Sequence, residues 1–528
     1  MRIFDTYVQK LKYKVLTELA RQTWVGNDAF SVFNDIANQV VKKGEPTMSC
    51  CIYKDRAIVA ERIRIALGGK KEDHNVIQVI DIACDECPVA GHVVTDLCRG
   101  CVAHACVDAC KLGAITVDSH QKAEIDKSKC VECGKCAKSC PYSAIANFKR
   151  PCEKACKVDA ISMAPDGVAQ IDSEKCIECG ACVYKCPFGA TLDVSSITDI
   201  IKTIVDSDNN KNYHVHAIVA PAIAGQFQYA KAGQLISAIR ELGFYAVEEV
   251  ALGADIVAYK EAQELQEKGF LTSSCCPAFV KYIKMKFPQL AEHISHNLSP
   301  MAETGKLIKE QDPDAKIVFI GPCTAKKGEV RKPEVHQYVD YVMTFEELQA
   351  MIDSKDIAVD QLPETELDTA TYYGRVFART GGLSEAVTEA VREQKAAAEA
   401  AKVDAPDGAG ASGAVASGEA GTNSGKPASG DAGTNPGKPA SGDGACDGDS
   451  TDSKPFVFDP IVCDGIDSCK TALLRASKGL LPNNFIEGMV CTDGCIGGAA
   501  CLSHGNADKR AIDNYGKKAT HKEIRDVL

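Results

Sequence analysis

Two cysteine repeats of one pattern constrain most strongly how this chain can fold. In each repeat the spacing is C-x2-C-x2-C-x3-C, and proline follows the last cysteine. In this pattern the first three cysteines hold one [4Fe-4S] cluster, while the fourth reaches the neighbouring cluster. Structural zinc also takes four thiolates, but the tandem spacing and the Cys-Pro ending are much more specific to iron-sulfur clusters. The motifs are Cys130, Cys133, Cys136 and Cys140, and Cys176, Cys179, Cys182 and Cys186.

The cysteines around these motifs extend the pattern. Residues 84 to 186 hold sixteen cysteines, enough for four clusters of four. The crossing rule assigns three of the clusters. The fourth rests on counting, because Cys152 and Cys186 need two more ligands and the pair in ACDECP can supply them. The predicted sets are Cys98, Cys101, Cys106 and Cys140; Cys130, Cys133, Cys136 and Cys110; Cys176, Cys179, Cys182 and Cys156; and Cys84, Cys87, Cys152 and Cys186.

The composition excludes several classes of protein. With 528 residues and 27 cysteines the chain is much longer than secreted disulfide scaffolds, and residues 1–24 lack an apolar signal core. They predict an amphipathic helix with Leu11, Val15, Leu16 and Leu19 at helical spacing. The chain has no run of about 18 apolar residues, so we expect no membrane-spanning helix. Its net charge of −12 argues against nucleic-acid binding. We expect a cytoplasmic, reducing setting, where clustered cysteines bind metals.

The pattern after residue 196 alternates between strands and helices. Strands are predicted at HAIVAPAIA, AVEEVAL and AKIVFIG, and helices around residues 235–242 and 261. This alternation predicts βαβ units around a mostly parallel sheet. Residues 396–455 are instead rich in Ala, Gly, Ser, Asp and Pro, and the unit AGTNSGKPASGD recurs as AGTNPGKPASGD. That composition predicts a disordered insertion between two parts of one domain.

Three fragments of this second region carry further cysteines. They are TSSCCPAF at 272–279, GPCTAKKGE at 321–329 and EGMVCTDGCIGG at 487–498. No single turn of chain could bring these cysteines together, so they make chemical sense only if the fold converges them on a buried metal centre. Cys491 and Cys495 are four residues apart, which places both sulfurs on one face if the segment is helical.

Together, these motifs resemble those of an FeFe-hydrogenase, from about residue 84 to 505 outside the insertion. The resemblance implies reversible H2 oxidation and proton reduction at an H-cluster, a [4Fe-4S] cubane bridged to a di-iron unit with CO, cyanide and dithiolate ligands. Three to four further [4Fe-4S] clusters would relay electrons to ferredoxin or a similar carrier, and maturation enzymes would supply the di-iron unit. The cluster ligands would be Cys276, Cys323, Cys491 and Cys495, with Cys495 as the bridging thiolate.

The family's fold implies an α/β catalytic domain, two lobes with mostly parallel sheets flanked by helices, preceded by α+β bacterial ferredoxin-like cluster domains. On this chain we expect a helical lead-in at 1–80 and a cluster domain at 81–195. The catalytic domain would occupy 196–395 and, with the C-terminal tail, 456–528, and the insertion 396–455.

The resemblance also assigns roles to single residues. Cys275 would pass protons beside the di-iron unit, a role suited to a thiol whose pKa lies near ambient pH. Glu261, Glu264 and Ser295 would connect it to solvent. Lys326 would pair with a cyanide ligand, because a buried ammonium needs an anionic partner, and Glu329 with Lys326. Further cofactor contacts matched by position are Ala220, Pro221, Thr380, Gly381, Gly382 and Met489.

Several positions depart from the family's usual pattern. Ala278 and Phe279 follow CCP where Gly-Trp is usual, Gly321 replaces a methionine, and Ala222 replaces a serine. The variants resemble a less characterised clostridial branch. They bear on catalytic bias and oxygen tolerance rather than on ligation, since the surroundings of a metal site tune its properties.

Two alternative functions stay open: an H2- or redox-sensing hydrogenase-like protein, and an iron-sulfur assembly factor without turnover. The paired Cys275 and Cys276 and the intact Lys326 favour the enzyme, since sensors usually lose the proton-passing thiol. The remaining cysteines are predicted to be packed thiols: Cys50, Cys51, Cys446, Cys463, Cys469 and Cys501. His92, His104, His293, His296 and His504 are predicted to be surface or hydrogen-bonded histidines rather than ligands.

Overall fold

The computed structural model describes residues 4–27, 31–44, 51–70, 73–85, 87–88, 90–403 and 456–528. Met1–Glu393 and Phe458–Leu528 form one compact unit, so both flanks of the insertion belong together, as the sequence predicts. Gln394–Val457 form the other unit. Helix α19, Gly382–Val403, continues past residue 396, so the predicted disorder is wrong for residues 396–403, whose alanines favour helix. The two repeat copies, and Cys50 and Cys446, lie outside the described residues.

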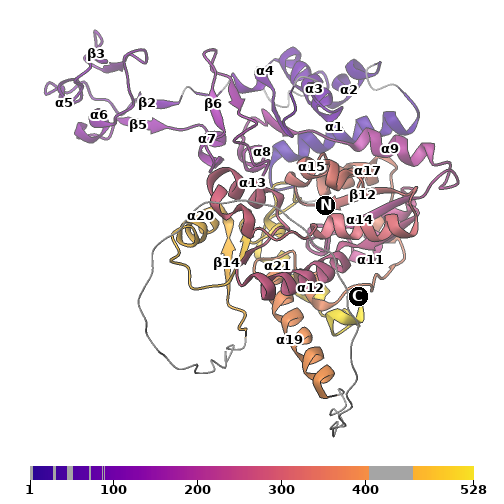
Figure 1. Cartoon of the computed structure of the whole chain (residues 1–528). Coiled ribbons are helices and arrows are strands. Elements are labelled where there is room, and N and C mark those ends of the chain that lie inside the picture. The colour runs from indigo at the N-terminus through magenta and orange to yellow at the C-terminus, as the bar shows by residue number, and fades with distance from the viewer. Residues whose placement is uncertain are drawn as a thin grey trace, which may run out of the picture. The chain divides into compact units, whose positions relative to one another are not determined.

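The N-terminal helices are α1 (Tyr7–Trp24), α2 (Phe33–Val40) and α3 (Ile52–Ala66), which pack against one another (Figure 1). Thr6 caps α1 by accepting from the Gln9 amide, and the predicted apolar stripe of α1 is buried. Cys51 precedes α3 and is exposed, so the prediction of a packed thiol is wrong there. Cys51 is the extended residue just before α3, and the sequence pattern did not indicate this position.

The cluster region is built from short antiparallel strand pairs and short helices. The pairs are β1 (Ile77–Val79) with β8 (Thr191–Asp193), β2 (Gly91–Val94) with β5 (Ile145–Phe148), β3 (Ile115–Val117) with β4 (Ala123–Ile125), and β6 (Ile161–Met163) with β7 (Ala169–Ile171). The helices are α4 (Asp81–Cys84), α5 (Ala105–Asp108), α6 (Lys135–Ser139), α7 (Pro151–Ala155) and α8 (Ala181–Lys185). The strand-like segment VIQVIDIA, residues 76–83, forms a strand only to Val79, because α4 begins at Asp81. This is the α+β arrangement that we expected before the α/β region.

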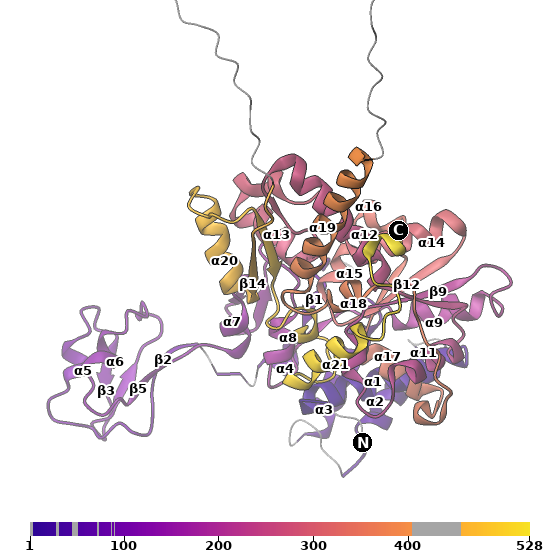
Figure 2. The same cartoon turned by 90° about the horizontal axis from the view of Figure 1, so that it is seen from below.

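The larger sheet of the α/β region is fully parallel, with strand order β10-β9-β12-β13. Its strands are β9 (Val215–Val219), β10 (Ala246–Glu249), β12 (Lys316–Gly321) and β13 (Tyr341–Thr344). AVEEVAL is strand only to Glu249, because α12 begins at Val250. The associated helices are α9 (Ile197–Asp206), α10 (Ile223–Gln226), α11 (Ala232–Glu241), α12 (Val250–Lys268), α14 (Pro300–Gln311), α15 (Ala325–Glu329), α16 (Pro333–His336) and α17 (Phe345–Ser354). Every residue of β9 is buried, as expected for a central strand that α14 packs against (Figure 2).

A second parallel sheet joins segments from both sides of the insertion. Its strand order is β11 (Leu271–Thr272), β15 (Phe485–Met489), β14 (Pro460–Asp464). Helices α13 (Pro277–Lys286) and α20 (Gly465–Ala476) pack beside it (Figure 1). The remaining elements are η1 (Pro288–His293), η2 (Val359–Gln361), α18 (Tyr372–Val376), η3 (Cys495–Gly497), α21 (Asn506–Gly516) and η4 (Ile524–Asp526). The two parallel sheets with their helices confirm the predicted α/β fold class.

A group of buried charges joins three segments that are distant in sequence. Lys12 of α1 donates to Asp193 at 2.5 Å and to Glu346 at 2.7 Å. Lys327 donates to the other oxygen of Asp193 at 2.7 Å and to Glu347 at 2.8 Å. Burial alone would raise the pKa of Asp193, but the two ammonium groups hold it well below its usual value. The N-terminal helix is thereby fixed to the cluster region and to α17.

Within the described residues, the helices are all too short or too polar to cross a bilayer.

Candidate functional site

The cysteine fragments follow the carboxyl ends of parallel strands in both sheets. Cys275 and Cys276 follow β11, Cys323 follows β12, and Cys491 follows β15. Ligands of open parallel sheets bind outside the carboxyl ends of the strands, where the loops diverge. The topology therefore brings into one region the fragments that lie more than 200 residues apart in the sequence.

The four predicted ligand cysteines are each partly buried and lie within electrostatic reach of one another. Burial, with the charge of Cys276 next, raises the pKa of Cys323 to about 11. Burial and the charges of Cys323 and Cys276 raise the pKa of Cys495 to about 12, and the same causes raise that of Cys491 well above its usual value. Such a pocket disfavours thiolates unless a cation neutralises them. The donor set therefore fits a bound metal cluster.

The segment between Cys491 and Cys495 is a turn rather than a helix, so the condition for placing both sulfurs on one helical face is not met. Cys495 instead begins the short helix η3. Gly494 has φ +80°, and a Cβ there would lie 2.7 Å from the backbone nitrogen of Thr380. The close approach of the Thr380 loop forces this turn, and glycine permits it.

Lys326 is buried at the edge of this pocket. Its ammonium forms an ion pair with Glu329 at 2.6 Å and donates to the carbonyl of Cys275 at 3.3 Å. Burial lowers the pKa of Lys326, but the charge of Glu329 and its hydrogen bond outweigh this, and the net pKa is raised. The cation therefore stays charged beside the cysteines, and the predicted pairing of Lys326 with Glu329 is present.

Cys275 does not have the near-neutral pKa that its predicted role suggested. Burial raises the pKa of its thiol well above the usual value, and the charges of Glu261, Cys276 and Cys495 raise it further. The group poised near neutral pH is Glu261, which is fully buried in α12. Burial raises the pKa of Glu261 to about 7, although hydrogen bonds from Ser295 and Ser274 oppose the shift.

Ser295 lies between the two glutamates of α12. Its hydroxyl donates to Oε2 of Glu264 at 3.3 Å, and its hydrogen bonding also lowers the pKa of Glu261. Glu261 accepts from the backbone N–H of Ser274, next to Cys275, at 3.4 Å. The structure thus places Ser295 and Glu261 between Glu264 and the backbone next to Cys275.

The outer end of this chain contains residues that the sequence analysis missed. Glu264 accepts from Lys268 Nζ at 2.7 Å, from Asn297 Nδ2 at 2.9 Å, and from the backbone N–H of His296 at 3.1 Å. The His296 ring lies 2.7 Å from the same carboxylate and is largely exposed. Burial raises the pKa of Glu264, but the bonds from Lys268 and His296 lower it overall. The spacing of Glu264 and Lys268 on one helix was the available signal; none pointed to His296.

Some predicted cofactor contacts already have partners within the protein. Ala220 and Met489 are buried, at the ends of β9 and β15. Gly381 has φ +88°, as a glycine turn requires, but its N–H donates to Glu487 at 2.7 Å. The other oxygen of Glu487 accepts from the Ser384 N–H at 2.8 Å. Glu487 was missed because a single buried carboxylate within a strand has no sequence signature.

Several relay cysteines lie close to other members of the set predicted for them. The pKa of each of three cysteines, Cys106, Cys136 and Cys179, is raised first by burial and then by cysteines of its own predicted set. The four crossing cysteines share a further feature, since each sulfur accepts from the backbone N–H four residues later, at 3.2–3.4 Å. Such N–H groups stabilise cluster sulfurs. These cysteines are Cys110, Cys140, Cys156 and Cys186.

The fourth predicted set also lies together. Burial raises the pKa of Cys152 to about 11, with contributions from the charges of Cys186, Cys84 and Cys87. Arg150, buried beside them, donates to Cys84 Sγ at 3.6 Å and to the Cys87 carbonyl at 3.1 Å. The sequence analysis did not single out Arg150, because its partners depend on tertiary packing.

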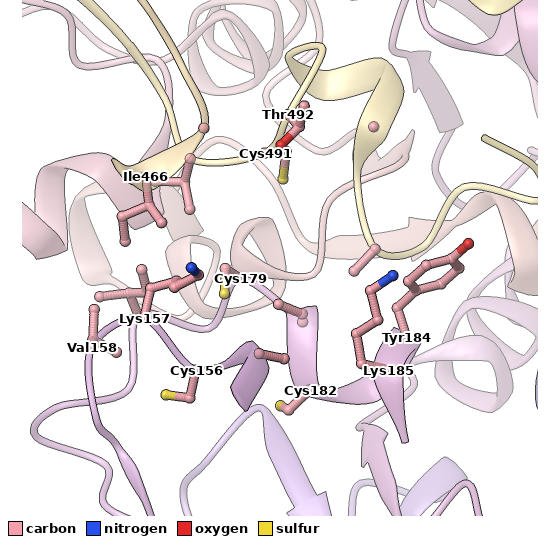
Figure 3. Close-up of a pocket in the computed structure, with 18 of the residues that line it drawn as sticks. Cys156, Lys157, Val158, Cys179, Cys182, Tyr184, Lys185, Ile466, Cys491 and Thr492 are labelled. Atoms are coloured by element: carbon pink, nitrogen blue, oxygen red, sulfur yellow. The ribbon is translucent and has the colours of Figure 1, made fainter. Parts of the chain in front are cut away.

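A cavity of about 830 Å³ lies between the second motif and Cys491. Figure 3 shows Cys156 and Cys182 on one side of it and Cys491 pointing inward from the opposite side. Cys176 and Cys179 also line it. Gly180, between the second and third cysteines of the motif, has φ +74°, and a Cβ there would lie 2.6 Å from Thr324 Oγ1. The cavity suits a cluster that is held by one region and faces the other.

Comparisons with known proteins agree with this geometry. Residues 213–499 match the family model described as iron only hydrogenase large subunit, C-terminal domain. Residues 97–144 and 150–190 match a 4Fe-4S dicluster domain.

Iron hydrogenase 1 of Clostridium pasteurianum is 30% identical over 319 residues, 54% of each chain. The cytosolic Fe-S cluster assembly factor NAR1 of Kluyveromyces lactis is 37% identical over 95 residues, 18% of this chain and 20% of that protein. The chain spans about half the length, or less, of the curated relatives it matches. A solved structure of a single-residue variant of [FeFe]-hydrogenase HydA1 from Chlamydomonas reinhardtii aligns with TM-score 0.45 and 20% identity over 63% of this chain and 92% of that one.

Proposed function

Because the chain belongs to the iron-only hydrogenase large-subunit family, we propose that it is an FeFe-hydrogenase, a ferredoxin-type oxidoreductase acting on H2. The observation that carries the proposal is the pocket in which Cys276 raises the pKa values of Cys323 and Cys495 beside the charged Lys326. This pocket lies next to Cys275 and a chain of ionisable groups.

Cys276, Cys323, Cys491 and Cys495 would hold the H-cluster. When bound, its di-iron unit supplies the site at which H2 is split or formed, and the cubanes supply one-electron redox centres. Lys326 remains charged through its ion pair with Glu329 and would balance an anionic ligand of the cofactor. The buried Ala220 and Met489, and Pro221, Gly381 and Gly382, would exclude water around it.

Protons would move between Cys275 Sγ and solvent through Glu261, Ser295 and Glu264. The pKa of Glu261, raised to about 7 by burial, lets its carboxyl take up and release a proton near neutral pH. The Ser295 hydroxyl can donate to one carboxylate while accepting from the other, so it can pass a proton without becoming charged. Glu264, with a lowered pKa, is the ionised outer member of the chain.

Electrons would leave through the cluster region. The cavity beside Cys491 would bring the cluster of Cys156, Cys176, Cys179 and Cys182 next to the active site. We propose ferredoxin or a similar carrier as electron partner and dedicated maturation enzymes for the di-iron unit. We also propose a cytoplasmic location, since the cysteines that the structure describes are all free thiols.

A second candidate is an iron-sulfur assembly factor, because several matched relatives are NAR1 proteins. The NAR1 matches cover less of this protein than the hydrogenase match does. An assembly factor without turnover also leaves the linked Cys275, Glu261 and Ser295 unexplained. An H2 sensor is the third, with the same cofactor and little turnover.

Infrared spectroscopy combined with H2 assays tests the proposal. Holoprotein, matured and handled anaerobically, should show CO and cyanide stretches and evolve H2 from a reduced carrier. Cys275→Ser should keep the stretches and lose about 10²-fold or more in turnover. Cys51→Ser, at the exposed residue before α3, should change neither.

Absent stretches would favour the assembly factor, and stretches without measurable turnover would favour the sensor. Full turnover of Cys275→Ser would remove the thiol from the proton route.

A further inference from the structure

Two histidines and two carboxylates lie together at the amino end of β9, away from the cysteines. His214 and His216 flank the first residue of β9, Asp312 is the C-cap residue of α14, and Glu248 lies on β10. One nitrogen of each imidazole and one oxygen of Asp312 lie within 4.8 Å of one another. The backbone around them is held by the sheet, since the His214 carbonyl accepts from the Lys316 N–H at 2.8 Å.

His216 presents a free nitrogen to this group. The residue is 7% exposed, and its Nδ1 lies 2.8 Å from Oε1 of Glu248. Its buried Nε2 has no hydrogen-bond partner among the described residues and lies 3.9 Å from Oδ2 of Asp312. If Glu248 accepts the Nδ1 proton, Nε2 carries a lone pair, which is the arrangement of a metal-binding histidine with a carboxylate behind it. A buried polar atom without a partner is otherwise costly.

His214 completes the set of donors from the exposed side. Its Nδ1 lies 2.7 Å from the same oxygen of Asp312, and its ring stacks on Tyr245 with centroids 3.8 Å apart. Ligands about 2.1 Å from a tetrahedral ion are about 3.4 Å from one another. The two separations from Asp312, 2.7 and 3.9 Å, lie on either side of this value. Small side-chain rotations would therefore bring the three ligand atoms to tetrahedral spacing.

The charge of the group suits a divalent cation. Lys309 and Lys316 lie close in sequence but pair with Asp340, at 3.6 and 3.3 Å. In the part of the chain that the structure describes, the ion pairs found for Asp312 and Glu248 involve only His214 and His216. A divalent cation bound at the imidazoles would balance the two carboxylates.

We propose that His214, His216 and Asp312 bind a divalent transition-metal ion of the zinc type, with Glu248 orienting His216. Imidazole and carboxylate together suit such ions, and three protein ligands leave one position for water. The ion would join the central strand β9 to β10 and to the connection between α14 and β12. The site lies at the amino end of β9, while Ala220 follows its carboxyl end, about 16 Å away. The proposed metal site does not depend on the proposed hydrogenase activity.

Zinc uptake by the intact holoprotein tests this site. Wild type incubated anaerobically with a small excess of Zn2+ and desalted should retain one more zinc per chain than His216→Gln or Asp312→Asn, by elemental analysis. Samples are compared at equal iron content, because unfilled cysteine sites also take zinc. Glu248→Gln should weaken zinc binding about 10- to 100-fold, as expected for a residue behind the ligand.

His336→Gln, at an exposed histidine of α16, is the matched control and should retain as much zinc as wild type. Asp312→Asn keeps the size of a partly exposed side chain, so it guards against misfolding of the His216 variant. Equal zinc retention by wild type and Asp312→Asn at equal iron content would overturn the proposal. Retention lost equally in the His336 variant would also overturn it.

Discussion

The Ser295 hydroxyl donates to Oε2 of Glu264 across 3.3 Å, joining a residue of the loop after η1 to the C-terminal part of α12. The same hydroxyl accepts from Asn297 Nδ2 at 3.0 Å, which holds it in place between the two glutamates. A proton that passes between Glu261 and Glu264 would therefore use this one oxygen.

Ser295→Ala should lower H2 turnover about 10²-fold, because it removes the hydroxyl that links the two carboxylates on the proposed path. Ser295→Thr keeps the hydroxyl and should retain most activity. Turnover is measured at equal iron content and equal CO band intensity. Equal activity of the Ala and Thr variants would show that protons take another route.

Glu264→Gln should depress turnover while leaving the clusters assembled. The amide keeps the hydrogen bonds to Asn297 but cannot carry a proton at neutral pH. Glu267→Gln, at an exposed position of the same helix, is the control and should be active. Iron content and H2 evolution are compared in both. Unchanged activity of Glu264→Gln would exclude this residue from the path.

Glu261 should make stability depend on pH. Burial raises its pKa from 4.5 to about 7, so the native state binds a proton that the unfolded chain releases between these values. The carboxyl therefore costs stability increasingly as pH rises from about 4.5 through 7, up to about 3 kcal/mol. Glu261→Gln should gain stability relative to wild type over that range and keep the gain above it. Thermal inactivation midpoints of holoprotein at several pH values from about 5 to 8 measure the difference, and a pH-independent difference would contradict the assignment.

Cys152→Ala should remove one cluster. Cys152 lies with Cys84, Cys87 and Cys186, so its loss should lower the iron content by about four atoms per chain. Cys501→Ala, at a buried cysteine assigned to no cluster, should keep full iron content. Iron analysis and electron paramagnetic resonance of the reduced protein distinguish the two. If the iron content of Cys152→Ala equals that of wild type, the chain holds only three relay clusters.

Asp193→Asn should destabilise the protein strongly. Its carboxylate is shared by Lys12 and Lys327, and both ammonium groups are buried. Leaving a buried charge without its partner costs about 3–5 kcal/mol. Asp199→Asn, at an exposed position of α9, should cost little. Rates of thermal inactivation compare the two variants, and equal rates would show that the glutamates alone satisfy the lysines.

Local spacing was enough to predict the features that depend on neighbouring residues. The gaps within each C-x2-C-x2-C-x3-C-P motif, the apolar stripe of α1 and the strand-helix alternation after residue 196 are set within a few turns of chain, where geometry has a fixed period. The ends of elements were less certain. Strand and helix meet at Asp81 and Val250 because packing, rather than propensity, decides where a strand stops.

Tertiary structure alone decided which distant groups share an environment. The near-neutral pKa belongs to Glu261 rather than to Cys275, because burial depends on the whole core around α12. His296, Glu487 and Arg150 acquire their partners across tens or hundreds of residues, and no short pattern encodes such contacts. The amino-acid sequence determined which metal-binding motifs the chain carries. Only the packing of the two parallel sheets determined that their cysteines meet, because both sheets end their strands at one region.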